Sequence, residues 1–179
     1  METCSIVVIV RNLYKSGACS SKPFILHDCE GVVLYNVVEK TCSSYVLAAR
    51  SKAGLNISKC LHFDPNSDGS SVWDPLHKQG KFDKVTDRKK DDHVFGEMAI
   101  AVAAQVTVPA RGSDDVEMCL VWDIPVVSFV GQGRQYTKFY SKMFGREKAP
   151  LKIVDYTLKN YARWEEDIWG WQKPILDDK

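Results

Sequence analysis

Short apolar runs, each bounded by turn-forming residues, fill most of the chain up to about residue 130. They are rich in Val, Ile, Tyr and Ala, and β-branched or aromatic runs set between Gly, Pro, Asn, Asp or Ser are typical of strands. Many short strands separated by turns favour an antiparallel β-sandwich, so the predicted fold class is mainly β. The strands are expected at residues 5–10, 31–38, 44–50, 56–63, 97–108 and 116–130.

The run VEMCLVWDIPVVSFV, at residues 116–130, has the clearest alternation. Its even-numbered residues from Val116 to Trp122 fall on one face of a strand, and its odd-numbered residues fall on the other. Because Trp122 alternates with core positions, we interpret it as a packing residue. Pro125 has no N–H for the ladder and is expected to bend the strand or to lie at an edge.

Residues 64–96 break the pattern with a long, polar, turn-rich insertion. Insertions of this length in a compact domain are usually functional or disordered, so we expect a mobile excursion with one helical turn near 72–79. Trp73 is the residue expected to anchor it to the sandwich.

After Pro150 the hydrophobic period lengthens to three or four residues, which indicates an amphipathic helix. Pro150 suits the first helical turn, while Gly170 and Pro174 mark the end or a kink. We therefore predict a sandwich domain at 1–149 and a helix with a linker at 150–179. The apolar residues form a stripe along one side of this helix, and the stripe is wide, aromatic and needs a partner surface. Its residues are Leu151, Val154, Leu158, Tyr161, Trp164, Ile168 and Trp171.

Composition narrows the classes of partner. Lys and Arg number 24 against 23 Asp and Glu, so no basic excess favours nucleic acid. No apolar run approaches the ~20 residues of a membrane helix, and Glu2 and Arg11 flank an apolar core too short for a signal peptide. Without a secretory signal, Cys29, Cys42 and Cys60 are expected as free thiols of the reducing cytosol.

No motif predicts a metal, a cofactor or a catalytic residue. The six cysteines contain no C-x-x-C pair, and the four histidines lack metal-ligand spacing. DPNSDG (64–69) opens like a calcium loop, but Pro75 stands where the bidentate Glu belongs, so a turn is favoured. GQGRQY (131–136) has Tyr136 where a phosphate loop needs a small residue, and again a turn is favoured.

Three acidic residues lie among the C-terminal tryptophans, as acids do in sugar sites: Glu165, Glu166 and Asp167. A glycoside hydrolase needs two carboxyl groups that face each other across the sugar. Neighbours on one helix diverge by about 100° per residue, so a polar helix face is the favoured interpretation.

The chain contains, in order, LVWDIPVVSF (120–129), GRQYTKFYSKMFG (133–145) and YARWEEDIWGWQKPILDDK (161–179). This order and spacing resemble the N-terminal domain of the non-lysosomal glucosylceramidases, the bile-acid β-glucosidase family. Three upstream segments are similar to the same domain, so the resemblance spans nearly the whole chain; they are SIVVIVRN (5–12), GVVLYN (31–36) and HFDPNSDGSSVWDPLHKQGKFD (62–83).

The resemblance implies a β-sandwich that precedes a larger (α/α)6 domain in a retaining β-glucosidase of glucosylceramide. In that family the catalytic Glu and Asp belong to the (α/α)6 domain, so no catalytic residue is expected here. The family has strands ahead of the one matched by residues 5–11, which implies a fragment whose sandwich is incomplete at its N-terminus. It also implies a cytoplasmic protein, peripheral on the cytosolic face of endoplasmic reticulum or Golgi membranes.

The leading hypothesis is a non-catalytic domain that supports and orients the catalytic domain. The residues expected to dock onto that domain are Trp164, Ile168, Trp169, Trp171 and Pro174. One alternative is a stand-alone carbohydrate-binding module, with Trp73 as a candidate sugar platform. The other is an assembly partner that binds the full-length enzyme through the same helix.

Overall fold

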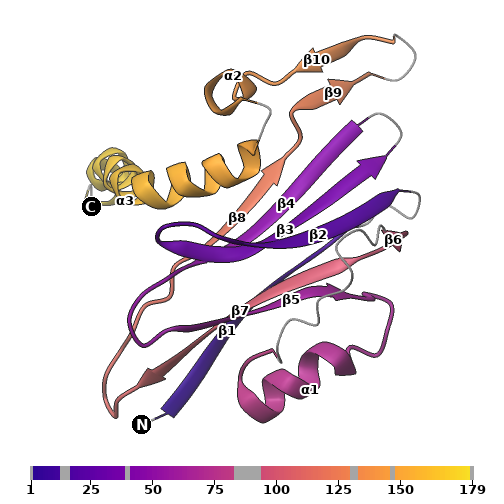
Figure 1. Ribbon diagram of the computed structural model, residues 1–179. Coiled ribbons are helices and arrows are strands. Elements are labelled where there is room, and N and C mark those ends of the chain that lie inside the picture. Colours follow the sequence, from indigo (N-terminus) through magenta and orange to yellow (C-terminus); the bar gives the residue numbers. More distant parts are fainter. Residues whose placement is uncertain are drawn as a thin grey trace.

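The protein forms four layers, in which two antiparallel sheets face each other and a helix covers each outer face (Figure 1). This computed structural model describes residues 2–12, 17–38, 41–82, 94–129, 133–145 and 148–177. The elements, in chain order, are β1 (Glu2–Arg11), β2 (Ala18–Ile25), β3 (Cys29–Val38), β4 (Thr41–Arg50), β5 (Asn56–Phe63), α1 (Ser70–Gln79), β6 (Val94–Phe95), β7 (Ala99–Val108), β8 (Met118–Asp123), β9 (Val126–Ser128), β10 (Gln135–Thr137), α2 (Ser141–Phe144) and α3 (Ala149–Leu176).

The larger sheet has the order β6-β2-β3-β4-β8 and the smaller one the order β1-β7-β5. Every pairing in them is antiparallel, so the predicted antiparallel sandwich is confirmed. β9 and β10 form a separate two-stranded hairpin that stands beyond the end of the sandwich (Figure 1). Among the described residues, no helix is both long and apolar enough to span a bilayer.

Three apolar clusters hold the layers together. The first lies between the sheets, where Leu34 and Leu47 of the larger sheet meet Ile100 and Val102 of β7. The second lies between the larger sheet and α3, and the third joins β7 to α1 through the small residues Ala101 and Ala103. The middle strand of the smaller sheet is thus buried on both faces, since alternate side chains of a strand point in opposite directions.

Three strands lie outside the predicted ranges: the short β6 and β10, and the longer β2. β2 reads ACSSKPFI, and its serines and Pro23 obscure the apolar run. Pro23 is tolerated because β6 pairs with β2 only at Ala18 and Cys19, which leaves the other side of Pro23 unpaired within the described part of the chain. The break predicted at Pro125 is confirmed, because β8 ends at Asp123 and β9 begins at Val126.

The predicted packing role of Trp122 is wrong, although the alternation along β8 is as expected. Cys119, Val121 and Asp123 are buried, whereas Leu120 and Trp122 are 58% and 65% exposed. The two exposed side chains share a strand face with Met118, which packs against the cluster between the sheets. The larger sheet has five strands and the smaller three, so this face of β8 extends past the edge formed by β1.

The start of the predicted insertion is a turn followed by a helix. Asp64 accepts a hydrogen bond from the backbone N–H of Asn66 at 2.9 Å, which confirms the turn at DPNSDG. The helix α1 is anchored by Val72, which is 1% exposed, and by the neighbouring Phe82. Trp73 is 56% exposed, so its predicted anchoring role is wrong. Residues 83–93 of the insertion lie outside the described residues.

Candidate interdomain docking surface

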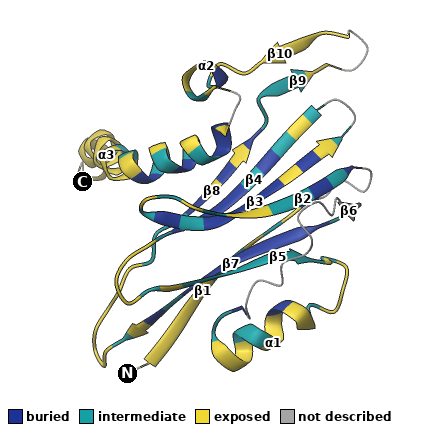
Figure 2. Ribbon diagram, in the orientation of Figure 1, coloured by how far each residue is buried: buried dark blue, intermediate teal, exposed yellow. Residues whose placement is uncertain are grey.

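The first half of α3 is an integral part of the sandwich. Pro150 stands at the start of the helix, as predicted, and the apolar stripe turns toward the outer face of the larger sheet. Val154 is fully buried there and Leu158 is 4% exposed, and both contact the cluster that contains Cys29 and Cys119. Burial raises the pKa of the Cys29 thiol to about 11. In Figure 2 this half of α3 carries dark blue and teal residues among yellow, exposed ones.

A polar contact network holds α3 where it reaches the end of the sheet. The guanidinium of Arg50, at the end of β4, donates to the carbonyl oxygen of Leu158. Arg50 Nε lies 2.7 Å from Glu117 Oε2 as an ion pair, and its guanidinium carbon is 5.8 Å from the centre of the Tyr161 ring. A hydrogen bond to Glu117 also raises the pKa of Tyr161. Sequence reasoning missed this network, because the periodicity of a helix does not reveal which strand end meets it.

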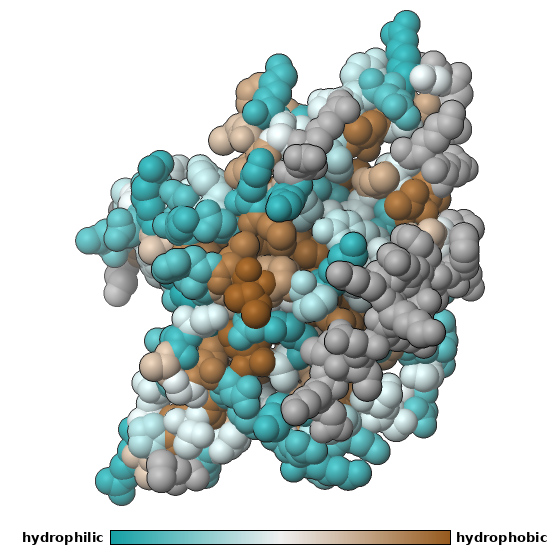
Figure 3. All heavy atoms as spheres, viewed as in Figure 1, coloured by the Kyte–Doolittle hydropathy of each residue, from teal (hydrophilic) through white to brown (hydrophobic). Residues whose placement is uncertain are grey.

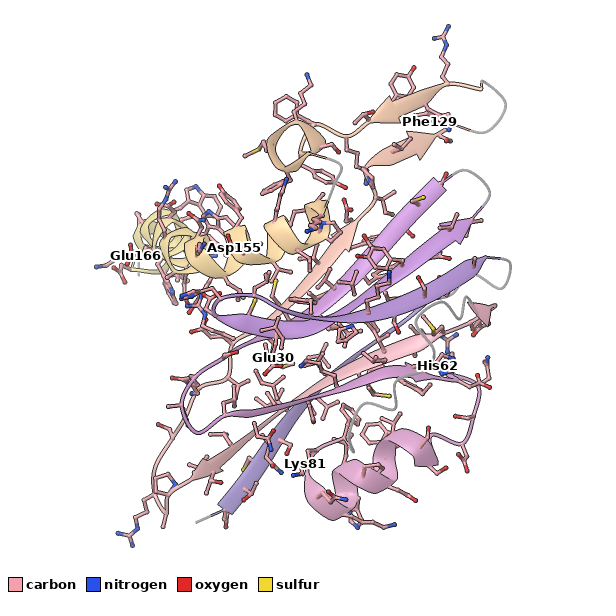
Figure 4. All side chains as sticks on the ribbon, viewed as in Figure 1. Glu30, His62, Lys81, Phe129, Asp155 and Glu166 are labelled. Atoms are coloured by element: carbon pink, nitrogen blue, oxygen red, sulfur yellow. The ribbon has the colours of Figure 1, made fainter. Side chains whose placement is uncertain are left out.

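The second half of α3 leaves the sandwich. From Tyr161 to Leu176 each residue except Trp164 and Gln172 is exposed, and Figure 4 places Glu166 at the end of α3 that lies away from both sheets. Five large apolar side chains on this half are more than half exposed, and we call them the apolar ridge: Ile168, Trp169, Trp171, Ile175 and Leu176. A contiguous exposed apolar surface of this kind marks an interaction site more often than chance exposure does.

Trp164 differs from the other predicted docking residues, because it packs partly within the chain. Its ring centroid lies 5.7 Å from that of Tyr156, and Tyr156 lies 5.4 Å from Phe144 of α2. Trp164 is therefore half-buried, whereas Trp169 and Trp171 are 57% and 72% exposed.

α3 extends further along the chain than the end or kink predicted at Gly170 and Pro174. The helix continues through Gly170 and Pro174 to Leu176, so all but the last residues of the segment at 150–179 are helical. Pro174 cannot donate a hydrogen bond to the carbonyl of Gly170, but it stands in the last turn, where few backbone bonds depend on it. Pro174 itself is exposed beside the apolar ridge.

The other predicted candidates lie apart from the ridge. The side chains of Glu165, Glu166 and Asp167 are exposed on the projecting half of α3, where Asp167 lies 3.8 Å from Arg163. Trp73 lies on α1, on the opposite outer face of the sandwich, so no shared site forms with the ridge. Within the described ranges no three His, Cys, Asp or Glu side chains are grouped to hold a metal ion.

A buried hydrogen-bond network fixes the segment between β8 and α3, and sequence reasoning did not find it. The Tyr140 hydroxyl donates to Asp123 Oδ1 at 2.6 Å and accepts from the N–H of Ile124 at 3.0 Å. Ser44 donates to the other oxygen of Asp123 at 3.3 Å. Burial and the bond to Asp123 raise the pKa of Tyr140. A buried acid at the last position of a strand is the signal that could have pointed to this network.

The comparison with known families agrees with this architecture. A family model described as "beta-glucosidase 2, glycosyl-hydrolase family 116 N-term" matches residues 3–164. The match covers the two sheets, the buried half of α3 and the polar network around Arg50, and it ends four residues before Ile168, the first residue of the ridge. The chain therefore belongs to the beta-glucosidase 2, glycosyl-hydrolase family 116, and residues 3–164 correspond to that family's N-terminal domain.

Proposed function

We propose that this chain is the non-catalytic domain that supports and orients the catalytic domain of a β-glucosidase that hydrolyses glucosylceramide. The observation that supports the proposal is the division of α3 into a half sealed on the sandwich and a half whose apolar ridge is exposed. The family match supports the same role, since an N-terminal domain of a glycosyl hydrolase has a catalytic domain as its partner.

The ridge has the composition of a protein interface. Burial of one large apolar side chain contributes about 1.5–3 kcal/mol to the free energy of association. Burial of the five ridge residues against a second domain can therefore hold the two domains together. Tryptophan is also among the residues that dominate binding energy at interfaces. Exposed acidic residues, Glu165, Glu166 and Asp167, precede the ridge on the same half of α3, and exposed polar residues are typical of the rim of an interface.

Activity of the isolated chain tests the non-catalytic role. The purified chain is expected to release no 4-methylumbelliferone from 4-methylumbelliferyl-β-glucoside. Turnover that is abolished by an active-site-directed glucosidase inhibitor would contradict the proposal.

Binding in trans tests the docking role. A separately expressed catalytic domain of a family 116 enzyme is expected to bind the chain, and Trp169→Ala with Trp171→Ala is expected to weaken binding at least about thirtyfold. Ile25→Ala is the matched control, because Ile25 is 78% exposed on β2 and does not belong to the ridge. The docking role fails if the double variant and the control bind equally well.

A second candidate function is a carbohydrate-binding module, and two exposed indoles favour it. Trp73 on α1 and Trp122 on β8 are both more than half exposed, and flat aromatic rings can stack against sugars. Titration with glucosides is then expected to give a saturable change in tryptophan fluorescence that is lost in Trp73→Ala. A flat response in the unmodified chain would remove this candidate. Binding to the intact enzyme through the ridge, the assembly-partner alternative, predicts co-precipitation that depends on Trp171.

A further inference from the structure

The outer edge of β1 is open to pairing with a further strand. β1 stands at the end of the order β1-β7-β5, so within the described residues no strand pairs with its outer side. It is ten residues long and has the sequence ETCSIVVIVR, without Pro or Lys. Natural proteins protect edge strands with Pro, inward-pointing charges or bulges, because an unprotected edge is a template for another strand.

The opposite edge of the same sheet carries such protection. Lys59 of β5 shares a strand face with Ile57, which packs between the sheets, and it forms an ion pair there with Glu30 of β3 (Figure 4). The pairing of β5 with β7 also shifts register between Cys60 and Phe63, as at a β-bulge. Figure 3 shows hydrophilic atoms in teal among the apolar atoms on the face that carries β2 and β5. Of the two edges of the smaller sheet, β1 is therefore the one suited to a further strand.

The backbone groups of β1 that point outward follow from its pairing with β7. The N–H of Asn12 donates to the carbonyl oxygen of Met98 at 2.8 Å, which continues the register of this ladder. In an antiparallel pair alternate residues carry the hydrogen bonds, so the even-numbered residues of β1 bond to β7. The N–H and C=O groups of the odd-numbered residues from Thr3 to Ile9 therefore point away from β7. They have the spacing that a neighbouring strand requires.

A strand added to this edge would face β8 of the larger sheet. β1 packs against β4, β7 packs against β3 and β4, and β5 packs against β2 and β3. β8 is the neighbour of β4 and ends the larger sheet. Because the strands of a sheet are about 4.8 Å apart, the next position beside β1 lies opposite β8.

The face of β8 above that position is apolar and exposed. Leu120 and Trp122 are 58% and 65% exposed, and the ring of Trp122 stacks on that of Tyr45 with centroids 6.0 Å apart. Tyr45 and Met118 pack against the cluster between the sheets, so the exposed surface continues an interface that the sandwich already has. Ile6, on the face of β1 that turns toward the larger sheet, is 50% exposed beside it.

We propose that β1 and the exposed face of β8 bind an extended segment of a partner protein, which pairs antiparallel with β1. In this mode of recognition the backbone hydrogen bonds give affinity and alternate side chains give specificity. The side chains of the segment that face β8 are apolar and cover Leu120 and Trp122, and those between them are polar. The proposal does not depend on docking of a catalytic domain, because α3 covers the other face of β8.

A second copy of the chain does not fit this position. A two-fold axis that pairs β1 antiparallel with β1 of the copy places both larger sheets on the same side of the joined smaller sheets. β8 of one copy would then overlap β4 of the other, since β4 faces β1 and β8 extends past it. A single extended segment, with no sheet of its own above it, avoids this overlap.

Fluorescence anisotropy with a synthetic peptide tests the proposal on the whole 179-residue chain. The probe is a fluorescein-labelled peptide of about nine residues, in which valine alternates with threonine between terminal lysines. Saturable binding is expected, and Leu120→Ser with Trp122→Ser is expected to weaken it at least about tenfold. Ile25→Ser with Trp73→Ser is the matched control, because it removes an exposed aliphatic side chain and an exposed indole elsewhere. The control is expected to bind within about twofold of the unmodified chain, and circular dichroism verifies that each variant is folded.

N-methylation of the peptide separates backbone pairing from apolar contact. Opposite side chains of an antiparallel pair lie on the same face, so the threonines lie opposite the odd-numbered residues of β1 and direct their N–H groups at them. A peptide N-methylated at each threonine is therefore expected to bind at least about tenfold more weakly. A peptide N-methylated at each valine carries its methyl groups on the outer edge and is expected to bind within about twofold of the unmethylated probe.

Three results would overturn the proposal. Absence of saturable binding would exclude an open strand position beside β1. Equal binding of the two methylated peptides would show that the contact is apolar without strand pairing. A dimer of the chain in analytical ultracentrifugation that Ile9→Pro abolishes would show that β1 pairs with a second copy, since proline is tolerated where an edge N–H points outward.

Discussion

Replacement of Leu158 by Ala measures how much the packing of α3 on the larger sheet contributes to the free energy of unfolding. Leu158 is 4% exposed and lies in the cluster that α3 forms with β3, β4 and β8. Truncation of a buried Leu removes its transfer free energy and leaves a cavity, which costs about 2–5 kcal/mol. Because the backbone of Leu158 is held by Arg50, the helix cannot collapse freely into the space, and we expect a loss of about 3 kcal/mol.

Urea denaturation, followed by far-ultraviolet circular dichroism and by tryptophan fluorescence, measures the free energy of unfolding. A loss of about 3 kcal/mol lowers the melting temperature of a domain of this size by about 6–12 °C. Leu176→Ala is the matched control, since it makes the same change on the same helix at a side chain that is 60% exposed. Leu176→Ala is expected to stay within about 0.5 kcal/mol of the unmodified chain. Equal stability of the two variants would show that α3 is not part of the cooperative unit.

Three further predictions concern single groups in the sandwich. Tyr140→Phe leaves the buried Oδ1 of Asp123 without its 2.6 Å hydrogen bond and is expected to cost about 1–3 kcal/mol in the same urea assay; an unchanged midpoint would contradict the network. Gly31→Ala is expected to prevent or severely weaken folding, because the new Cβ would lie 1.9 Å from the carbonyl oxygen of Leu47, and soluble, cooperatively melting protein would contradict this. The raised pKa of Cys29 favours the protonated thiol in the folded state, so its contribution is complete below its ordinary value of 9.0 and is lost as the pH rises toward about 11. The loss is expected to be about 2–3 kcal/mol and smaller in Cys29→Ala, when urea midpoints are compared at about pH 8 and about pH 11.

Local patterns predicted most of the strands and the long helix, because those elements are determined by short-range periodicity. The strand at 56–63 has the predicted bounds, and the break at Pro125 follows from the missing N–H of proline. β2 was missed because its serines and Pro23 are acceptable only on a strand with little pairing on one side. The extent of pairing on that side depends on where β6 ends, and the residues of β2 carry no information about β6.

Burial was harder to predict than secondary structure. The alternation along β8 is regular, but Trp122 is exposed because the smaller sheet does not reach opposite it. Likewise, Val72 and Trp73 are neighbours, and the phase of α1 against β7 decides which of them is buried. The number of strands in each sheet and the rotation of a helix about its axis are set by tertiary packing. The sequence of one strand or helix therefore shows that it has two different faces, but not which face is buried.

The unbroken backbone of α3 determines the direction in which the apolar ridge faces. A flexible tether limits only the distance between two bodies, whereas a continuous helix also sets their angle and rotational phase. Each residue turns an α-helix by about 100° and advances it by about 1.5 Å. One alanine inserted after Asn160 would therefore rotate Trp169 and Trp171 by about 100° around the helix axis while the sandwich stays as it is, and seven would restore their bearing to within about 20°.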